Sequence, residues 1–236
     1  MSTFTTYKTR GHGWDADYPH YVYIYPNRDD DDTKADHACE GIVDGLDQLM
    51  EFDAIDFYWV RKYNPDSSDS YGYPNCDNSD MTACYNDFKD WYEGKTDHRV
   101  GTHIVVDQDF SGGHADGGDS VNKSAFNIAR CGSAGMSSGS RASEGTATVI
   151  HEALHTMIIK DLVVGNEDSD LAPNNEHELG KVHQDGSNEA SPFVNNNNRE
   201  TSDSGFCNSD LKVKGERAEM VYCEKRGVWE TTREVE

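Results

Sequence analysis

The sequence predicts an α+β protein in which one domain is built from two lobes, residues 1–162 and residues 163–236. Two observations predict this. Short alternating apolar segments and longer segments with helical apolar spacing interleave in the first lobe. Beyond Val164 the composition shifts to Asn, Asp, Glu, Ser and Gly, which predicts an irregular lobe. With 236 residues, the chain is long enough to bury a core for such a domain.

The first elements follow from periodicity. Residues 20–26, "HYVYIYP", alternate and predict a strand. Residues 33–52 follow a run of Asp suited to a helix N-terminus and place apolar side chains at helical spacing, so they predict a helix. Residues 54–60, "AIDFYWV", predict a second strand.

The later elements alternate in the same way. We expect a short helix over residues 81–92 and a third strand over residues 100–107. The stretch "QDFSGGHADGGDS" (residues 108–120) is too rich in glycine to predict regular structure. A helix is then expected over residues 140–160, and everything beyond Val164 is expected to be loop-dominated and held by disulfides and metal. The sequence shows no internal repeats.

The charge balance is strongly acidic, with 44 acidic and 21 basic residues and a net charge of −23. Such a chain has little to neutralise phosphate with, so we expect no nucleic-acid partner. Four Trp and twelve Tyr favour a folded protein over a disordered acidic chain. An evenly acidic surface suits high salt, which screens its self-repulsion, and predicts a halophilic source.

The six cysteines are scattered, and none forms a C-x-x-C pair; they are Cys39, Cys76, Cys84, Cys131, Cys207 and Cys223. An even, scattered set predicts disulfides in an oxidising compartment, with Cys76 to Cys84 as a plausible local bridge. No apolar stretch is long enough to span a membrane, and "MSTFTTYKTR" lacks a signal-peptide core. We therefore expect a secreted, extracellular monomer without its leader; a cytosolic protein with free thiols is the alternative.

The stretch "TVIHEALHTMIIKDL" (residues 148–162) carries the candidate chemistry. Residues four apart on a helix lie about 400° around and roughly 6 Å along, so His151 and His155 project side by side. That separation suits two bonds of about 2 Å to one Zn²⁺. Glu152 is placed to contact a zinc-activated water and to act as general base.

These residues resemble the zincin metallopeptidases, whose signature is HExxH. The metzincin branch extends it to HExxHxxGxxH, and the resemblance implies a twisted mixed sheet with an active-site helix. Here the glycine position is Ile158 and the third-ligand position is Asp161. Ile disfavours the positive φ that glycine permits. If the helix continues, Asp161 lies about 9 Å beyond His155 and cannot reach the metal.

A third ligand is available further along, in "LGKVH" (residues 179–183). Gly180 and His183 supply a Gly-x-x-His, as though an insertion had displaced the ending of the signature. The resemblance to metzincins is compatible with such an insertion, because the leishmanolysin branch has a long one before its third His. Asp161 is one alternative. The gluzincin branch, which uses a downstream Glu, suggests the others: Glu176, His177 and Glu178.

The resemblance also implies a Met-turn beneath the zinc. "ERAEMVYCEKRG" (residues 216–227) offers Met220 as a packing floor and Tyr222 as a hydroxyl near the tetrahedral intermediate. In metzincins the last strand before the active helix pairs with extended substrate. Residues 100–107 or 125–129 are candidates for that edge, with the glycine-rich stretch between them as the rim.

Four aspartates are candidate Ca²⁺ ligands, because Ca²⁺ prefers carboxylate oxygens: Asp107, Asp109, Asp116 and Asp119. We expect His103 and His114 to be structural or rim residues.

The sequence therefore predicts a secreted zinc-dependent endopeptidase that acts on proteins or peptides, with His151, His155 and His183 on the metal and Glu152 and Tyr222 as catalytic groups. The alternatives are a gluzincin-type metallopeptidase and a zinc-binding secreted module without catalysis.

Overall fold

The protein is represented by a computed structural model that describes residues 4–13, 15–27, 32–64, 81–94, 100–107, 113–116, 129–135, 142–158, 189–192, 215–216 and 219–234. Its larger sheet has six strands: β1 (Phe4–Gly11), β2 (Pro19–Pro26), β3 (Phe57–Tyr63), β4 (Gly101–Asp107), β5 (Gly113–Ala115) and β6 (Ala129–Gly135). The helices are α1 (Asp32–Glu51), α2 (Met81–Glu93), α3 (Ala142–Met157) and α5 (Tyr222–Glu234). The short strands β7 (Glu189–Ala190) and β8 (Gly215–Glu216) pair apart from this sheet.

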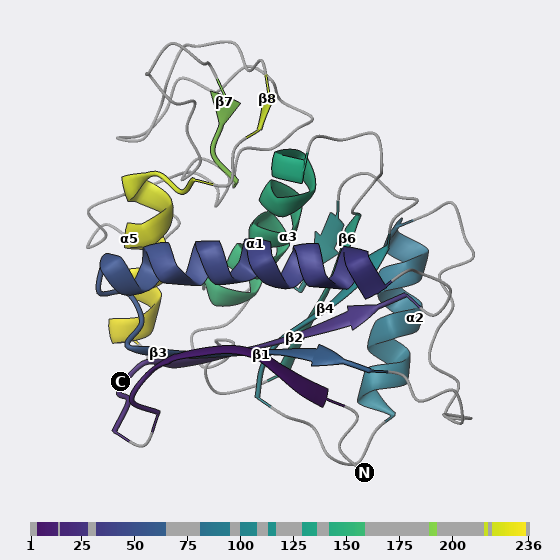
Figure 1. Ribbon diagram of the computed structural model, residues 1–236, viewed down its shortest axis with the longest axis horizontal. Coiled ribbons are helices and arrows are strands. Elements are labelled where there is room, and N and C mark those ends of the chain that lie inside the picture. The colour runs from purple at the N-terminus through teal and green to yellow at the C-terminus, as the bar shows by residue number, and fades with distance from the viewer. Residues whose placement is uncertain are drawn as a thin grey trace.

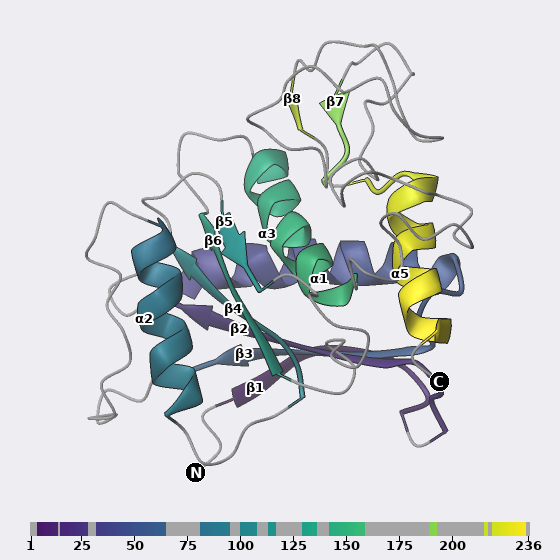
Figure 2. The same ribbon diagram turned by 180° about the vertical axis from the view of Figure 1, so that it is seen from behind.

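The large sheet is mixed, with strand order β1-β3-β2-β4-β6-β5. The four inner strands run parallel, and β1 and β5 are antiparallel edges. Helices α1, α3 and α5 lie on one face and α2 lies on the other (Figures 1 and 2). The expected mixed sheet is confirmed. Its inner strands are covered on both faces, as parallel strands require.

The face under α1 and α3 is aliphatic. Helix α1 buries Ala38, Ile42, Leu46 and Leu49 against the sheet and α3, which is the apolar stripe that its spacing predicted. Helix α3 lies over β6 and β4 and adds its own apolar side chains to the same core. The active-site candidates therefore project from a helix that the core holds in place.

The face under α2 is aromatic. Its core includes Tyr23, Tyr63, Phe88 and Tyr92, and it surrounds His103 on β4. The hydroxyls of Tyr25 and Tyr92 lie 2.8 Å from Nδ1 and 3.1 Å from Nε2 of His103. Because both ring nitrogens are hydrogen-bonded inside this core, His103 is a structural residue, as expected.

Most of the predicted elements are confirmed, with shifted boundaries. The strand expected at residue 54 begins at Phe57, because residues 54–56 belong to the turn that ends α1. Asp53 has a φ of 61°, and the Ala54 N–H donates to the Leu49 carbonyl at 2.9 Å. This is a left-handed helix C-terminus, which Asp tolerates better than most residues.

Several elements lie where the sequence analysis expected irregular structure or none, among them most of β6 and the short strands β7 and β8. Strand β1 occupies the N-terminal stretch, and β5 lies inside the glycine-rich segment. Helix α5 falls in the lobe expected to be irregular, and it contacts α3 and α1. The prediction of an irregular C-terminal lobe is therefore wrong for α5, which is an ordinary packed helix.

The cysteines divide into two kinds. Cys84 and Cys223 are disulfide-bonded, whereas Cys39 and Cys131 are free and buried. Cys39 belongs to the aliphatic core and Cys131 to the aromatic core, so the sheet separates them. The expectation of disulfides is wrong for these two residues. Burial raises the pKa of the Cys39 thiol to about 12, and it also raises the pKa of the Cys131 thiol. Cys76 and Cys207 lie outside the described residues.

No helix among the described residues is long and apolar enough to cross a membrane.

Candidate metal centre

Helix α3 brings the two predicted histidines together. Its residues Ile150, Ala153, Leu154 and Met157 are buried in the core, which fixes the rotation of the helix about its axis. His151 and His155 then share a half-buried position, and their Nε2 atoms lie 3.0 Å apart. Two Zn–N bonds of about 2.0–2.1 Å meeting at a tetrahedral angle would separate the nitrogens by roughly 3.3 Å. The observed pair is close to that separation.

The protonation of His151 follows from its other nitrogen. Nδ1 lies 2.7 Å from the Pro192 carbonyl oxygen. A carbonyl only accepts, so Nδ1 carries the hydrogen and, in the neutral ring, Nε2 carries the lone pair. That lone pair faces His155 Nε2, so a proton or a cation must lie between the two nitrogens. Metal-ligating histidines have this arrangement, in which one ring nitrogen donates an outer hydrogen bond and the other faces the metal.

Glu152 is buried beside this pair, and its Oε1 lies 4.0 Å from His151 Nε2. Burial raises its pKa well above the usual range, because the charged form is desolvated. A cation held by His151 and His155 would oppose that shift by favouring the carboxylate. This position suits a base for a water next to the metal and does not make Glu152 a ligand.

The edge strand β5 reaches the same place. A Cβ built on Gly113 would lie 2.6 Å from the Glu152 Cδ, and closer still to its Cγ and Oε1. With Glu152 in this position, only glycine fits at residue 113. The strand next to the base is β5, so the expectation that residues 100–107 form the edge is wrong: β4 is paired on both sides. The expected rim supplies the edge itself, and residues 125–128 lie outside the described residues.

The described residues do not test the predicted third ligand. Among the described residues, no group of three or more His, Cys, Asp or Glu side chains is placed to hold a metal. The predicted ligand and its alternatives all belong to undescribed stretches: His183, Asp161, Glu176, His177 and Glu178. Ile158 is described; its N–H still donates to the Leu154 carbonyl at 2.9 Å, and its φ is not positive. The chain therefore makes no glycine-type turn at Ile158.

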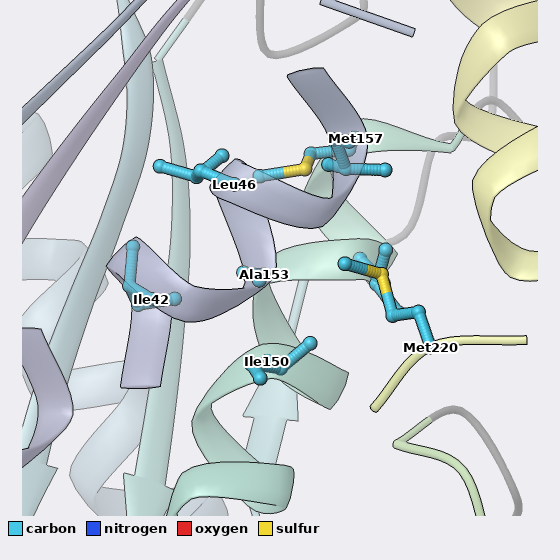
Figure 3. Close-up of a pocket in the computed structure, with 9 residues that line it drawn as sticks. Ile42, Leu46, Ile150, Ala153, Met157 and Met220 are labelled. Carbon is cyan, nitrogen blue, oxygen red and sulfur yellow. The ribbon is translucent and has the colours of Figure 1, made fainter. Parts of the chain in front are cut away.

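Met220 lies directly against α3. It lines a small apolar pocket with Ile150, Ala153 and Met157 of α3, beside Ile42 and Leu46 of α1 (Figure 3). Its backbone N–H donates to Gln48 Oε1 at 2.7 Å. Met220 is 2% exposed. Met220 therefore packs on the core face of α3, and its predicted place as a floor beneath the zinc stays a prediction.

Tyr222 is placed differently from Met220. Its ring is 52% exposed and packs edge-on against Phe52, with ring centroids 5.4 Å apart. A catalytic role for Tyr222 stays a prediction.

Asp116 follows the edge strand β5, and His114 lies within it. The Asp116 carboxylate accepts hydrogen bonds from Lys89 Nζ at 2.7 Å, the Tyr85 hydroxyl and the Cys131 N–H at 3.2 Å. Donors occupy both of its oxygens, which does not suit a Ca²⁺ ligand. Asp109 and Asp119 lie outside the described residues, as does the Asp107 side chain. His114 is exposed on β5, as expected of a rim residue.

Two features of the site had no signal that the sequence analysis used. The Pro192 carbonyl is a backbone group 41 residues from His151. Gly113 was treated as a loop residue, although a glycine beside a strand also marks close approach of another group.

Comparisons with known proteins add little. No protein-family model matches the sequence, and no curated protein matches it. The fold is similar to a solved structure titled "Crystal Structure of metalloproteinase-II from Bacteroides fragilis", at 17% identity and a TM-score of 0.38. The match covers 64% of this chain and 45% of that one, so the chain spans less than half of its neighbour. The function of this chain therefore rests on the chemistry of its own residues.

Proposed function

We propose that this chain is a zinc-dependent metallopeptidase of metzincin type that hydrolyses peptide bonds in proteins or peptides. One observation carries the proposal: the Nε2 atoms of His151 and His155 lie 3.0 Å apart next to the buried Glu152, and Nδ1 of His151 donates to the Pro192 carbonyl, which leaves the lone pair of the neutral ring on Nε2. Two converging imidazoles suit a borderline-soft divalent cation.

The residues have separate roles. His151 and His155 hold the metal, and we propose His183 as the third ligand. Zinc bound there would act as a Lewis acid that lowers the pKa of water and polarises a carbonyl. Glu152 takes the proton of the attacking water and delivers it to the leaving amine, which its buried position beside the histidines allows.

The substrate site follows from the edge strand. Among the described strands, β5 pairs only with β6, so its outer side can accept an extended peptide. Gly113 lies against Glu152, so a peptide added there passes the base. Main-chain pairing makes little demand on sequence, which favours proteins or unstructured peptides as substrates.

The test combines zinc content with hydrolysis of casein or gelatin, with and without chelator, in low and high salt. We expect about one zinc per chain and chelator-sensitive hydrolysis. Glu152→Gln should keep zinc and lose hydrolysis by about 10²–10⁴-fold, because it removes general-base catalysis. The matched control is Glu230→Gln, which changes a buried carboxylate paired with Arg226 and should keep both properties.

Each other outcome has a meaning. A Glu152→Gln protein as active as wild type would contradict the mechanism. Zinc without hydrolysis in the wild type would indicate a non-catalytic module. Loss of zinc in Glu178→Ala but not in His183→Ala would indicate the gluzincin alternative.

A further inference from the structure

Two segments distant in sequence meet beside Pro192, the residue whose carbonyl contacts the His151 ring. The first is the turn after β7, which contains Ser191 and Pro192; the second is the N-terminus of α5. The Pro192 carbonyl accepts the His151 Nδ1–H at 2.7 Å. The neighbouring Ser191 hydroxyl donates to Glu224 Oε1 at 2.8 Å. His151 is therefore connected to α5 through one dipeptide.

Glu224 uses its two oxygens for different partners. Oε1 accepts from Ser191, and Oε2 accepts the Val221 N–H at 2.8 Å. Glu224 is 0% exposed and Ser191 1% exposed. A buried carboxylate is costly unless hydrogen-bonded, and the N-terminus of a helix stabilises its charge. These contacts keep Glu224 in one position.

A helix cap alone does not account for this arrangement. Capping α5 needs only the Val221 N–H, whereas the second oxygen reaches the segment 33 residues earlier in the chain. The ring of Pro192 fixes its φ, which removes one backbone rotation between Ser191 and the Pro192 carbonyl, so holding Ser191 restricts where that carbonyl can lie. The Gln48 contact to the Met220 N–H fixes the approach to α5 from the side of α1. The carbonyl that orients His151 is thus connected through Ser191 to Glu224, and the segment that leads into Glu224 is anchored on α1.

We propose that Ser191 and Glu224 are positioning residues that hold the Pro192 carbonyl so that His151 keeps its hydrogen on Nδ1 and presents Nε2 to the metal. The proposal rests on the proposed function and deepens it. If the Pro192 carbonyl is not held in place, the His151 ring also populates the tautomer with the hydrogen on Nε2, and that tautomer cannot bind a metal through Nε2. Loss of an outer hydrogen bond to a ligating His typically costs about 10–100-fold in metal affinity.

The test uses Glu224→Ala, Ser191→Ala and the conservative Glu224→Gln. The matched control is Glu230→Ala, which removes another buried carboxylate of α5 whose partner is Arg226 at 3.0 Å. Zinc affinity is measured by competition with a chelator, and stability by chemical unfolding of the metal-free protein. The tautomer of His151 is measured by the ¹⁵N shifts of its ring in the metal-free protein.

We expect Glu224→Ala and Ser191→Ala to weaken zinc binding about 10–100-fold and to give mixed His151 tautomers. Glu224→Gln should restore most of the affinity, because its amide still bonds Ser191 and Val221. Glu230→Ala should lose stability but keep zinc affinity within about twofold.

The proposal is overturned if Ser191→Ala and Glu224→Ala bind zinc as tightly as Glu230→Ala, or if their His151 keeps the wild-type tautomer. If Glu224→Ala does not fold, Ser191→Ala decides alone. A wild-type protein that binds no zinc contradicts the proposed function, which is a separate result from equal affinities among the variants.

Discussion

At the scale of single residues, Gly113 leaves the space that the side chain of Glu152, the proposed base, occupies. An Ala at this position would bring its Cβ to 2.6 Å from the Glu152 Cδ. Glu152 is buried on a packed helix, so its carboxylate would have to move. We predict that Gly113→Ala lowers kcat about 100-fold, since a displacement of about 1 Å can cost that much, and leaves zinc content unchanged. Steady-state kinetics and metal analysis measure both.

The control for that substitution is Gly132→Ala on β6. Its Cβ would meet Ala115 Cβ at 3.2 Å and the His114 carbonyl oxygen at 3.4 Å, a tight contact that does not involve Glu152. A similar loss of kcat in both variants would mean that any disturbance of β5 is damaging, and the specific role of Gly113 would be wrong.

The sequence was informative about some of these residues and silent about others. Helical spacing alone predicts that His151 and His155 meet, and their Nε2 atoms do meet. Spacing along one helix carries no information about a backbone carbonyl from another segment. Pro192 was therefore unpredictable, because any residue type offers the same carbonyl.

At the scale of elements, a chain of hydrogen bonds ties α3 to the sheet. Thr156 donates to the Ala153 carbonyl at 2.7 Å, so the Thr102 hydroxyl must donate to Thr156, 2.5 Å away. His20 Nε2 lies 3.2 Å from the Thr102 hydroxyl and, by the same reasoning, donates to it. This chain connects β2 and β4 to the last turn of the histidine helix.

The buried His20 in this chain of hydrogen bonds makes the free energy of unfolding depend on pH. Burial lowers the pKa of His20 to about 3 from 6.5, so the unfolded state takes up a proton below pH 6.5 that the folded state refuses. Stability should therefore fall as pH drops from about 6.5 toward 3, by up to about 1.4 kcal/mol per pH unit. We predict that His20→Gln reduces this slope by about one proton, measured by urea unfolding at several pH values with chelator present.

His37 provides the comparison, because it is exposed on α1. His37→Gln should leave the slope as in wild type. If His20→Gln and His37→Gln titrate alike, burial of His20 is not the source of the acid sensitivity.

The elements that the sequence analysis predicted are those with a regular apolar pattern, either one apolar face on a helix or a run of buried side chains in an inner strand. Strand β1 is exposed along almost its whole length, so it lacks the alternation that marks a half-buried strand. Helix α5 buries polar side chains, including Glu224, Glu230 and Thr232. Hydrogen bonds satisfy these groups, for example from Thr232 to the Ala54 carbonyl at 3.1 Å. A helix that buries polar side chains lacks the apolar periodicity from which a helix is predicted.

At the scale of the whole molecule, the excess of acid sets the surface. Several of the described basic side chains pair with acids, as in Lys62 with Asp36 and Arg10 with Asp47. With 44 acidic and 21 basic residues, fewer than half of the acids can have a basic partner of their own. Composition predicts this imbalance; the positions of the pairs depend on the fold.

The contact between His151 and Pro192 also orders events in time. Helix α3 is built from local contacts, whereas the His151 contact closes 41 residues and the Ser191 contact closes 33. Local contacts form faster than long-range ones. We therefore expect a refolding chain to regain helical circular dichroism before it can take up zinc. Uptake that kept pace with the helix signal would contradict this order. If the chain has the proposed peptidase activity, a folding intermediate with the helix but without the metal site does not cut its unfolded neighbours.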